Sequence, residues 1–189
     1  MKLILASASP RRRDILDAAK IPYTVCPSSA DESYPASMPH CEVPELLARR
    51  KAEAVAATAS ADAVVVGADT VVLLDGALLG KPTDREDAKR MLRALSGRAH
   101  QVVSGIAVVA GGKCLSATVT TDVEMREISD TEIEAYVARD LPLDKAGAYG
   151  IQEAAGLFVR QIRGDYYNVV GLPLCRLGEL LGEMGFPLF

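Results

Sequence analysis

The sequence predicts a single α/β domain over residues 1–189 with a mixed sheet. Segments whose apolar residues follow helical spacing alternate along the chain with apolar runs typical of strands, and no segment repeats another. Residues 101–110 and 113–125 alternate apolar and polar positions on either side of Gly111 and Gly112, which predicts a long hairpin with a primed turn. A length of 189 residues lies in the usual range of one domain.

The chain is expected to begin with a strand that leads into a helix. Residues 2–6 form a short apolar run, and Ser9 followed by Pro10 is typical of an N-cap with proline at the first helical position. A second short strand is expected at residues 23–26, and a loop at residues 27–41.

A longer helix, a buried strand and another helix should follow. Apolar residues mark one helical face from residue 42 to about 59, and residues 63–74 are almost all apolar and β-branched, which predicts a buried strand. Thr83 and Glu86 have the spacing of a capping box, and Gly97 stands where a helix would end. We therefore expect a helix between these signals.

The last third of the chain is expected to hold two helices and one strand. Ser129 and Glu132 repeat the capping-box spacing ahead of the first of these helices. Residues 144–171 are glycine-rich and irregular, with a strand expected at residues 157–162. Apolar residues at helical spacing predict a closing helix over residues 174–184.

Composition and charge exclude several classes of protein. Apolar residues make up 49% and charged residues 24% of the chain, as in soluble globular proteins. The net charge of −4 argues against a broad nucleic-acid-binding surface. No run approaches the roughly 18 apolar residues of a membrane-spanning helix, and the N-terminal apolar run is too short for a signal peptide. We therefore expect no nucleic-acid partner, no membrane association and no export.

The four cysteines have neither paired nor zinc-ligand spacing. No C-x₂-C pair occurs, and His40, next to one of them, has no further ligand nearby. We expect four buried, reduced thiols in a cytoplasmic protein. The cysteines are Cys26, Cys41, Cys114 and Cys175.

Asp69 is the most informative residue, because it places one carboxylate inside the apolar run of residues 63–74. A buried, unpaired carboxylate would cost several kcal/mol. Two interpretations stay open: a structural partner neutralises the carboxylate, or it faces a cleft in which it binds a metal ion or deprotonates water. The preceding Gly67 allows close approach of backbone or ligand, which favours the functional interpretation.

Several basic residues are candidates for phosphate binding. Arg11, Arg12 and Arg13 occupy the first turn of the first expected helix, where the helix dipole favours an anion, so a bound polyphosphate would offset their mutual repulsion. A solvated basic face is the equally open alternative. Lys51 interrupts the apolar face of its helix, so it either reaches past the edge of the core or points into a phosphate-binding cleft.

Other polar residues are weak signals one by one. Lys81 precedes an expected helix, Glu32 lies in a loop, and the glycine-bearing loop of residues 144–152 carries Lys145 and Gln152. A metal-assisted reaction at a polyphosphate requires such scattered cations around one trapped carboxylate. The common phosphate-loop, dinucleotide and serine-hydrolase motifs are absent. The residues alone therefore predict a polyphosphate site.

Taken in order, the motifs resemble those of the Maf family of nucleotide pyrophosphatases over nearly the whole chain. One departure is Ser104, where threonine is more often expected, although the hydroxyl group is retained. The matching segments are Leu5-Ala6-Ser7-Ala8-Ser9-Pro10-Arg11-Arg12, Asp31-Glu32-Ser33, residues 48–55 with Lys51, Gly67-Ala68-Asp69-Thr70-Val71-Val72, Gly80-Lys81-Pro82, Leu95-Ser96-Gly97, His100 and Val102, residues 144–152, and Asn168-Val169-Val170-Gly171-Leu172-Pro173.

The resemblance implies an elongated α/β fold related to inosine-triphosphate pyrophosphatases, with a mixed sheet flanked by helices, two lobes and a central cleft, often in a homodimer. It implies hydrolysis of a nucleoside triphosphate to the monophosphate and pyrophosphate with Mg²⁺ or Mn²⁺. Asp69 would accept the proton of the attacking water and, with Glu32, hold the cation. Phosphate binding would fall to Ser7, Arg11, Arg12, Lys51, Lys81 and Lys145.

Three positions resemble those that set specificity in the dTTP/UTP branch of the family: Arg11, Thr70 and Gln152. A pocket of that kind would also admit modified pyrimidine nucleotides, as in a house-cleaning enzyme. Two alternatives stay open. The first is a pyrophosphatase for 7-methyl-GTP or another noncanonical nucleotide, and the second is a non-enzymatic regulator of septum formation.

Overall fold

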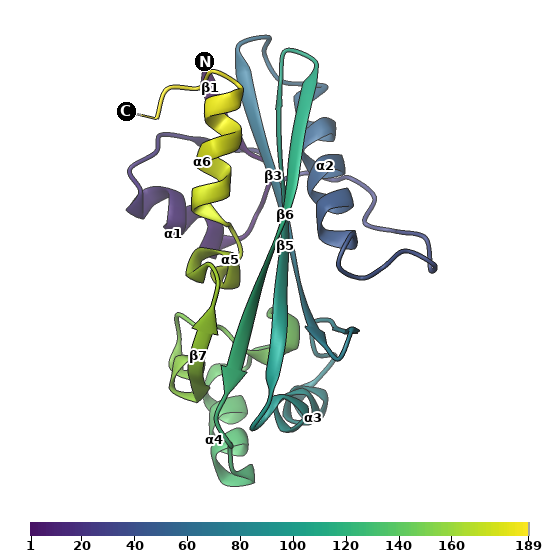
Figure 1. Cartoon of the computed structure of the whole chain (residues 1–189), viewed down its shortest axis with the longest axis vertical. Coiled ribbons are helices and arrows are strands. Elements are labelled where there is room, and N and C mark those ends of the chain that lie inside the picture. The colour runs from purple at the N-terminus through teal and green to yellow at the C-terminus, as the bar shows by residue number, and fades with distance from the viewer. Residues whose placement is uncertain (189) are drawn as a thin grey trace. The chain divides into compact units, whose positions relative to one another are not determined.

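Seven strands form one mixed sheet in the order β2-β1-β3-β5-β6-β7, with β4 paired to β3, and helices flank this sheet (Figure 1). The structure, a computed structural model, describes residues 1–188. The strands are β1 (Lys2–Leu5), β2 (Thr24–Val25), β3 (Ala63–Leu74), β4 (Ala77–Leu79), β5 (Ala99–Ala110), β6 (Lys113–Met125) and β7 (Val159–Arg163). The helices are α1 (Pro10–Ala18), α2 (Val43–Ala56), α3 (Arg85–Leu95), α4 (Asp130–Asp140), α5 (Tyr166–Val170) and α6 (Leu174–Glu183), with 3₁₀ turns η1 (Ala146–Ala148) and η2 (Ala154–Phe158). The predicted α/β class is confirmed.

The chain divides into two compact units. Unit 1 comprises Met1–Thr70, Ser104–Val119 and the residues from Gly171 onward, and unit 2 comprises Val71–Val103 and Thr120–Val170. The chain therefore passes from one unit to the other within β3, within β5, within β6 and directly after α5.

In unit 1, the strand β1 lies between β2 and β3, so the next two strands along the chain are added on opposite sides of it. Leu5 of β1 is paired with Val25 of β2 on one side and with Val66 of β3 on the other, both in parallel. The chain crosses from β1 to β2 through α1, then returns past β1 to β3 through α2. Because both crossovers are right-handed, α1 and α2 cover opposite faces, as Figure 1 shows. In such sheets, ligands usually bind beyond the carboxyl end of the strand at which the order reverses, which here is β1.

Two glycines let α2 lie directly against the strands of unit 1. A Cβ atom on Gly67 of β3 would stand 2.1 Å from the backbone oxygen of Ala48, and one on Gly105 of β5 would stand 2.2 Å from the backbone nitrogen of Glu45. No side chain fits at either point. The first two turns of α2 therefore contact the sheet backbone, which fixes the position of Lys51 in the next turn.

Unit 2 has an apolar core of its own. Leu92 of α3, Met125 of β6 and Ile133 of α4 are fully buried in one cluster. The rings of Tyr136 and Phe158 meet edge to face in the same cluster, with 5.4 Å between centroids. The irregular segment after α4 is therefore anchored by the core and not by strand pairing.

One predicted helix start is wrong and another is confirmed. The N-cap of α3 is Asp84, whose carboxylate accepts a hydrogen bond from the backbone N–H of Asp87, so Thr83 and Glu86 form no capping box. The Asp84 backbone is extended, and aspartate caps at least as well as threonine, so the helix starts one residue later than expected. The capping box of Ser129 and Glu132 is present at α4.

Strand bounds follow the predictions closely in the middle of the chain. β3 has the predicted bounds, and Gly111 and Gly112 have φ angles of 55° and 78°, as a primed hairpin turn requires. β7 begins at Val159 because η2 occupies the residues before it. The short strand β4 was not expected from the sequence.

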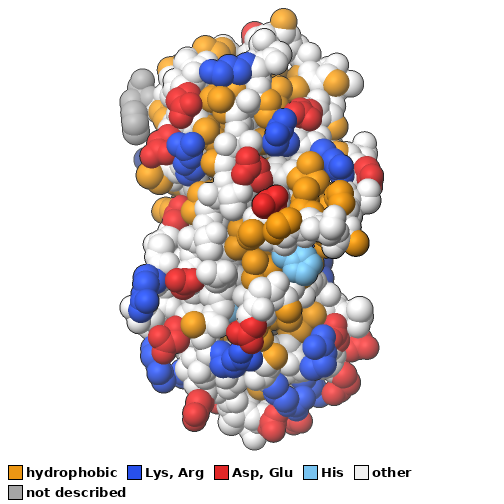
Figure 2. Space-filling model, turned by 45° about the vertical axis from the view of Figure 1, so that its right-hand side comes forward, with side chains coloured by type: hydrophobic (Ala, Val, Ile, Leu, Met, Phe, Trp, Pro, Cys, Tyr) orange, Lys and Arg blue, Asp and Glu red, His pale blue; other side chains and the backbone are white. Residues whose placement is uncertain are grey.

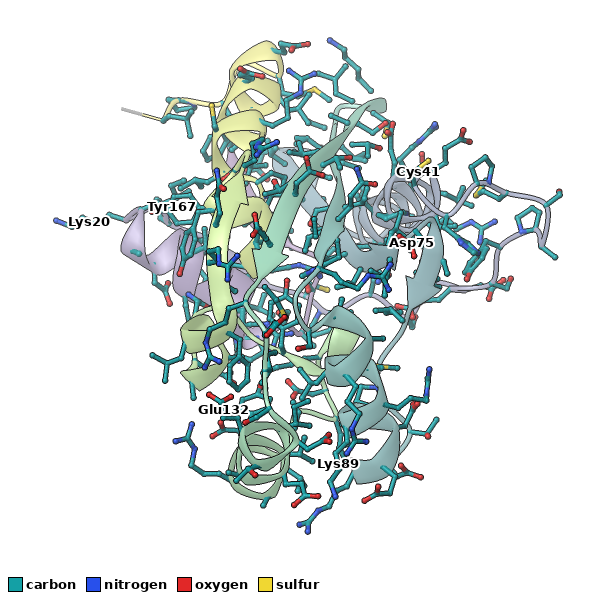
Figure 3. The ribbon with its side chains drawn as sticks, turned by 60° about the horizontal axis from the view of Figure 1, so that its bottom comes forward. Lys20, Cys41, Asp75, Lys89, Glu132 and Tyr167 are labelled. Carbon is teal, nitrogen blue, oxygen red and sulfur yellow. The ribbon has the colours of Figure 1, made fainter. Side chains whose placement is uncertain are left out.

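The predicted burial of the cysteines is wrong. Cys26, Cys41 and Cys175 are exposed and Cys114 is half-buried, and all four thiols are free, as predicted. Cys41 is labelled in Figure 3. Cys26 follows the two-residue edge strand β2, and Cys41 lies in the turn before α2, so neither has an element to cover it. Within residues 1–188, no helix is long and apolar enough to cross a membrane.

Candidate functional site

Two adjacent residues of β3 carry polar groups to opposite faces of the sheet. Asp69 and Thr70 are the only positions of β3 that are not buried. Because side chains alternate along a strand, Asp69 shares the face of Gly67, against which α2 packs, whereas Thr70 points to the opposite face. Ser7 lies two residues after the end of β1, the parallel neighbour of β3. These groups all lie in unit 1.

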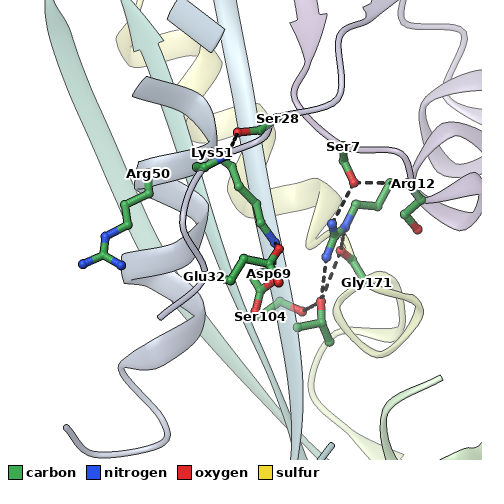
Figure 4. A network of polar contacts seen from close by, with 12 residues as sticks. Ser7, Arg12, Ser28, Glu32, Arg50, Lys51, Asp69, Ser104 and Gly171 are labelled. Carbon is green, nitrogen blue, oxygen red and sulfur yellow. Dashed lines mark hydrogen bonds and ion pairs between the residues drawn. The ribbon is translucent and has the colours of Figure 1, made fainter. Parts of the chain in front are cut away.

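A lysine joins two carboxylates on the α2 face (Figure 4). The ammonium group of Lys51 lies 2.7 Å from Oδ1 of Asp69 and 2.8 Å from Oε1 of Glu32. The side chains of Lys51 and Asp69 are 14% and 17% exposed, and that of Glu32 is 65% exposed. Lys51 therefore points inward, and Asp69 has a partner. We name these three residues the Lys51 cluster.

The pairing of Asp69 does not seal it inside the fold. Its partner, Lys51, is itself a predicted phosphate ligand, and both side chains keep access to solvent. Replacing a largely buried ion pair by well-packed apolar residues is often neutral or stabilising, so stability alone gives this pair no clear advantage. Asp69 therefore has a structural partner and is also accessible to a ligand, so both interpretations of this carboxylate stay open.

The donor set of the Lys51 cluster fits a hard divalent cation. Oxygens of Glu32 and Asp69 already contact one common cation, the Lys51 ammonium group. Mg²⁺ is usually held by one or two carboxylates, with phosphate oxygens and water completing its shell. Among the described residues there is no group of three or more His, Cys, Asp or Glu side chains arranged to hold a metal ion. A cation held here would need the substrate to complete its ligands.

The loop that carries Glu32 is tied to α2 beside Lys51. The carboxylate of Asp31 accepts hydrogen bonds from the backbone and the side chain of Ser33, which lowers the pKa of Asp31. Arg50 of α2 donates to the backbone oxygens of Asp31 and Ser33. Glu32 is therefore held between two residues that α2 anchors.

On the other face, Arg12 is the centre of a second set of hydrogen bonds. Its Nε donates to the Gly171 backbone oxygen at 2.8 Å, Nη1 to Ser7 Oγ at 2.8 Å and Nη2 to Thr70 Oγ1 at 3.3 Å. Thr70 Oγ1 also lies 2.8 Å from Ser104 Oγ. We name these five residues the Arg12 network (Figure 4).

The Arg12 network and the Lys51 cluster interact through their charges. Burial lowers the pKa of Arg12, and the negative charges of Asp69 and Glu32 act in the opposite direction. Arginine remains a cation in any protein site. The site in unit 1 therefore presents two fixed cations beside two carboxylates, which suits a polyphosphate accompanied by a divalent cation.

The remaining candidates fall into two groups. Arg11 lies in the first turn of α1, half-buried, in unit 1. Lys81, Lys145 and Gln152 belong to unit 2, where the Gly147 N–H donates to the Gly80 oxygen and so joins the segments that carry them. Gln152 and Lys81 are exposed. All four roles stay predictions.

Lys145 is less available than the sequence implied. Its ammonium group lies 2.9 Å from Oδ1 of Asp144 and 3.2 Å from Oε2 of Glu153, and its side chain is only 9% exposed. Two carboxylates thus already neutralise this cation. A phosphate would have to displace one of them to bind it.

Sequence reasoning assigned no role to Ser104 or Gly171. Gly171 lies in the Asn168–Pro173 motif, and Ser104 was noted only as a departure from threonine. Both positions were therefore visible in the sequence, but nothing in it indicated what they do. Only their contacts with Arg12 and Thr70 reveal one.

A buried pair anchors the loop of unit 2. His100 Nε2 lies 2.7 Å from the Tyr149 hydroxyl, while Nδ1 has no hydrogen-bond partner among the described residues. Burial lowers the pKa of His100 to about 4 and raises that of Tyr149. His100 is therefore neutral near pH 7.

The pKa of His100 predicts a loss of stability on acidification. Unfolded histidine has a pKa near 6.5, so between pH 6.5 and 4 the unfolded chain binds a proton that the folded chain does not. The contribution of His100 to the free energy of unfolding is complete above pH 6.5, and it falls by on the order of 3 kcal/mol as the pH is lowered to 4. Urea unfolding at several pH values should show a shallower pH dependence in His100→Gln than in the wild type. Equal slopes would contradict the assignment.

Comparisons with known proteins identify the family of the chain. The family model described as Maf-like protein matches residues 2–184. A dTTP/UTP pyrophosphatase of Thermococcus gammatolerans is 50% identical over 184 residues, which cover 97% of each chain. One of Alkaliphilus metalliredigens is 47% identical over 182 residues, 95% of this chain and 94% of the relative.

A search of solved structures finds a weaker likeness. The Staphylococcus aureus Ham1 protein superposes with a TM-score of 0.48 and 16% identity, over 66% of this chain and 72% of that one. The family assignment depends instead on the family model, which matches residues 2–184, and on relatives 47–50% identical over nearly the whole chain. The chain belongs to the Maf family.

Proposed function

We propose that this protein is a nucleoside triphosphate pyrophosphatase that hydrolyses dTTP and UTP to the monophosphate and pyrophosphate. The observation that carries the proposal is the Asp69 carboxylate, held in a buried strand by Lys51 and beside Glu32 and Arg12. The names and 47–50% identity of the two bacterial and archaeal relatives support the substrate.

In the proposed reaction a water molecule attacks the α-phosphorus. Asp69 accepts a proton from this water through its carboxylate, whose Oδ1 is held by Lys51. A new oxygen–phosphorus bond forms, the bond between the α-phosphorus and the bridging oxygen breaks, and the electron pair leaves with pyrophosphate. Arg12 and Lys51 stabilise the charge that develops on the leaving oxygens.

A divalent cation, Mg²⁺ or Mn²⁺, would be held by Glu32 and Asp69. When bound, it would neutralise phosphate oxygens and polarise the reacting phosphorus. Lys51 contacts both carboxylates and would be free to bind phosphate once another cation takes its place. Ser7, Arg11, Lys81 and Lys145 complete the proposed phosphate ligands.

We assign recognition of the pyrimidine to Arg11, Thr70 and Gln152. The Gln152 amide is exposed and has both a donor and an acceptor, as the edge of uracil or thymine requires. Modified pyrimidine triphosphates share that edge, so we also propose them as substrates.

A panel of nucleoside triphosphates tests the proposed function. Pyrophosphate release is expected from dTTP and UTP, at least tenfold faster than from GTP or 7-methyl-GTP, and it should stop with a chelator and return with Mg²⁺ or Mn²⁺. Preference for 7-methyl-GTP would place the enzyme in another branch. No release from any nucleotide would leave the septum-regulator alternative.

We also propose a homodimer in the cytoplasm with no nucleic-acid partner. Lys and Arg side chains are mixed with Asp and Glu on the face drawn in Figure 2, in agreement with the net charge of −4. Sedimentation equilibrium tests the dimer, cell fractionation tests the location, and a DNA-binding assay at about 0.15 M salt tests the absence of nucleic-acid binding.

A further inference from the structure

The turn that carries Glu32 lies in a long segment without helix or strand. Residues 26–42 connect β2 to α2, and Glu32 lies well inside this segment. Fixing the backbone of a single residue lowers an equilibrium constant roughly tenfold, unless other contacts already hold that residue. A cation site that uses Glu32 therefore binds tightly only if the turn is held before the cation arrives.

Arg50 of α2 holds this turn on both sides of Glu32. Its Nη1 donates to the backbone oxygen of Asp31 at 3.4 Å and to that of Ser33. Asp31 closes the same turn from within, because its Oδ1 accepts a hydrogen bond from the Ser33 backbone nitrogen at 2.9 Å and its Oδ2 accepts one from the Ser33 hydroxyl. The backbone before and after Glu32 is thus fixed to one guanidinium group.

Two adjacent residues of α2 hold Glu32 in different ways. In Figure 4 the Lys51 side chain extends toward Asp69, whereas that of Arg50 points away from it. Lys51 contacts the Glu32 carboxylate at 2.8 Å, and Arg50 contacts the backbone around it. In the proposed function, Lys51 leaves Glu32 for a phosphate and is replaced there by a divalent cation. The hydrogen bonds of Arg50 go to backbone oxygens, so they persist through this exchange.

We propose that Arg50 is a positioning residue, which keeps Glu32 within reach of the divalent cation after Lys51 has moved to the phosphates. The proposal deepens the proposed function, on which it rests. It concerns the affinity for the cation and not the chemical step, because the Arg50 side chain points away from Asp69.

Charge and position predict opposite effects of Arg50→Gln on cation binding. Removal of a positive charge near a cation site strengthens binding of the cation through electrostatics alone. Loss of the hydrogen bonds to the backbone oxygens of Asp31 and Ser33 instead releases the Glu32 turn and weakens binding. A weaker affinity for the cation therefore cannot result from the lost charge.

Binding of Mn²⁺ tests the proposal without turnover. The probe is Mn²⁺, followed by the electron paramagnetic resonance signal of the free ion, with a UTP analogue whose α- and β-phosphorus are joined by an imido group. The dissociation constant of Mn²⁺ is expected to rise about tenfold in Arg50→Gln. It should stay within about threefold of the wild type in Arg50→Lys, because both hydrogen bonds come from one nitrogen, which an ammonium group can replace.

Arg49→Gln is the matched control. Arg49 precedes Arg50 in α2 and forms an exposed ion pair with Glu53 at 3.7 Å, which contributes little to stability. The substitution removes the same charge from the same helix and leaves the Glu32 turn as it is. The dissociation constant of Mn²⁺ should therefore stay within about twofold of the wild type.

Two further measurements separate positioning from a general loss of structure. Hydrogen exchange in the metal-free protein should become faster at residues 27–41 in Arg50→Gln and remain unchanged in β3. The Mg²⁺ concentration for half-maximal pyrophosphate release should rise about tenfold, while kcat at saturating Mg²⁺ stays within about twofold of the wild type.

Three results would overturn the inference: an Arg50→Gln protein that binds Mn²⁺ at least as tightly as the wild type, a kcat that falls with an unchanged Mg²⁺ requirement, or a wild type that binds no Mn²⁺. Failure of the proposed function is a separate result. If the wild type binds Mn²⁺ but releases pyrophosphate from no nucleotide, the enzyme assignment is wrong, while the Mn²⁺ titration still decides whether Arg50 positions Glu32.

Discussion

Asp69→Asn is expected to lower kcat for pyrophosphate release from dTTP by roughly 10²–10⁴-fold, the usual contribution of a general base. Asparagine keeps the shape of the side chain but accepts no proton from water and carries no charge toward a cation. Lys51 keeps Glu32 as its partner, so the variant should remain folded. Pyrophosphate release at saturating Mg²⁺ and dTTP measures the effect, and thermal unfolding confirms the fold.

Asp75→Asn is the matched control for this prediction. Asp75 lies at the turn after β3 and pairs with Arg98 at 2.5 Å on the surface, where an ion pair contributes little. The same loss of a carboxylate from an ion pair should leave kcat within twofold of the wild type. If Asp69→Asn also retained its activity within a few-fold, Asp69 would be only the structural partner of Lys51, and the proposed mechanism would be wrong.

Two members of the Lys51 cluster, Lys51 and Asp69, could be singled out from the sequence because each violates a local rule, although their contact with each other was not predicted. Asp69 is the one acid in an apolar β-branched strand, and Lys51 interrupts an apolar helical face. Such violations cost free energy unless the two charges meet, and the structure brings them to 2.7 Å. A residue that conflicts with the pattern of its own strand or helix can thus be recognised from the sequence alone, before the fold is known.

The Arg12 network could not be predicted in the same way. Apart from Arg12, its members satisfy local rules: Ser7 and Gly171 lie in loops, and Ser104 is small enough for any strand. Arg12 and Gly171 are 159 residues apart, so only the packing of β1, β3 and the turn before α6 brings them together. The prediction that the cysteines are buried failed for a related reason. The average tendency of cysteine to be buried does not take into account whether a helix or strand packs over the segment that carries it.

Close packing of α2 links stability to the site. Gly67 has an ordinary backbone conformation. Glycine is required at this position because no room is left for a side chain, and not because of the φ angle. The backbone oxygen of Ala48 and the nitrogen of Ala52, on either side of Lys51 in α2, occupy the volume of a Cβ. Whatever moves this turn of α2 away from β3 also moves the Lys51 ammonium away from Asp69.

Gly67→Ala is therefore expected to lower the free energy of unfolding by about 3 kcal/mol or more, because a methyl group 2.1 Å from a backbone oxygen forces helix and strand apart. Urea unfolding measures this loss, and the folded fraction should also bind tripolyphosphate more weakly. Gly182→Ala in α6 is the control, since nothing lies within 4 Å of its added Cβ and alanine favours helix by about 0.5–1 kcal/mol. Two glycine-to-alanine changes should thus shift stability in opposite directions. A Gly67→Ala protein as stable as the wild type would mean that α2 is not locked onto β3, and that Lys51 reaches Asp69 by its own flexibility.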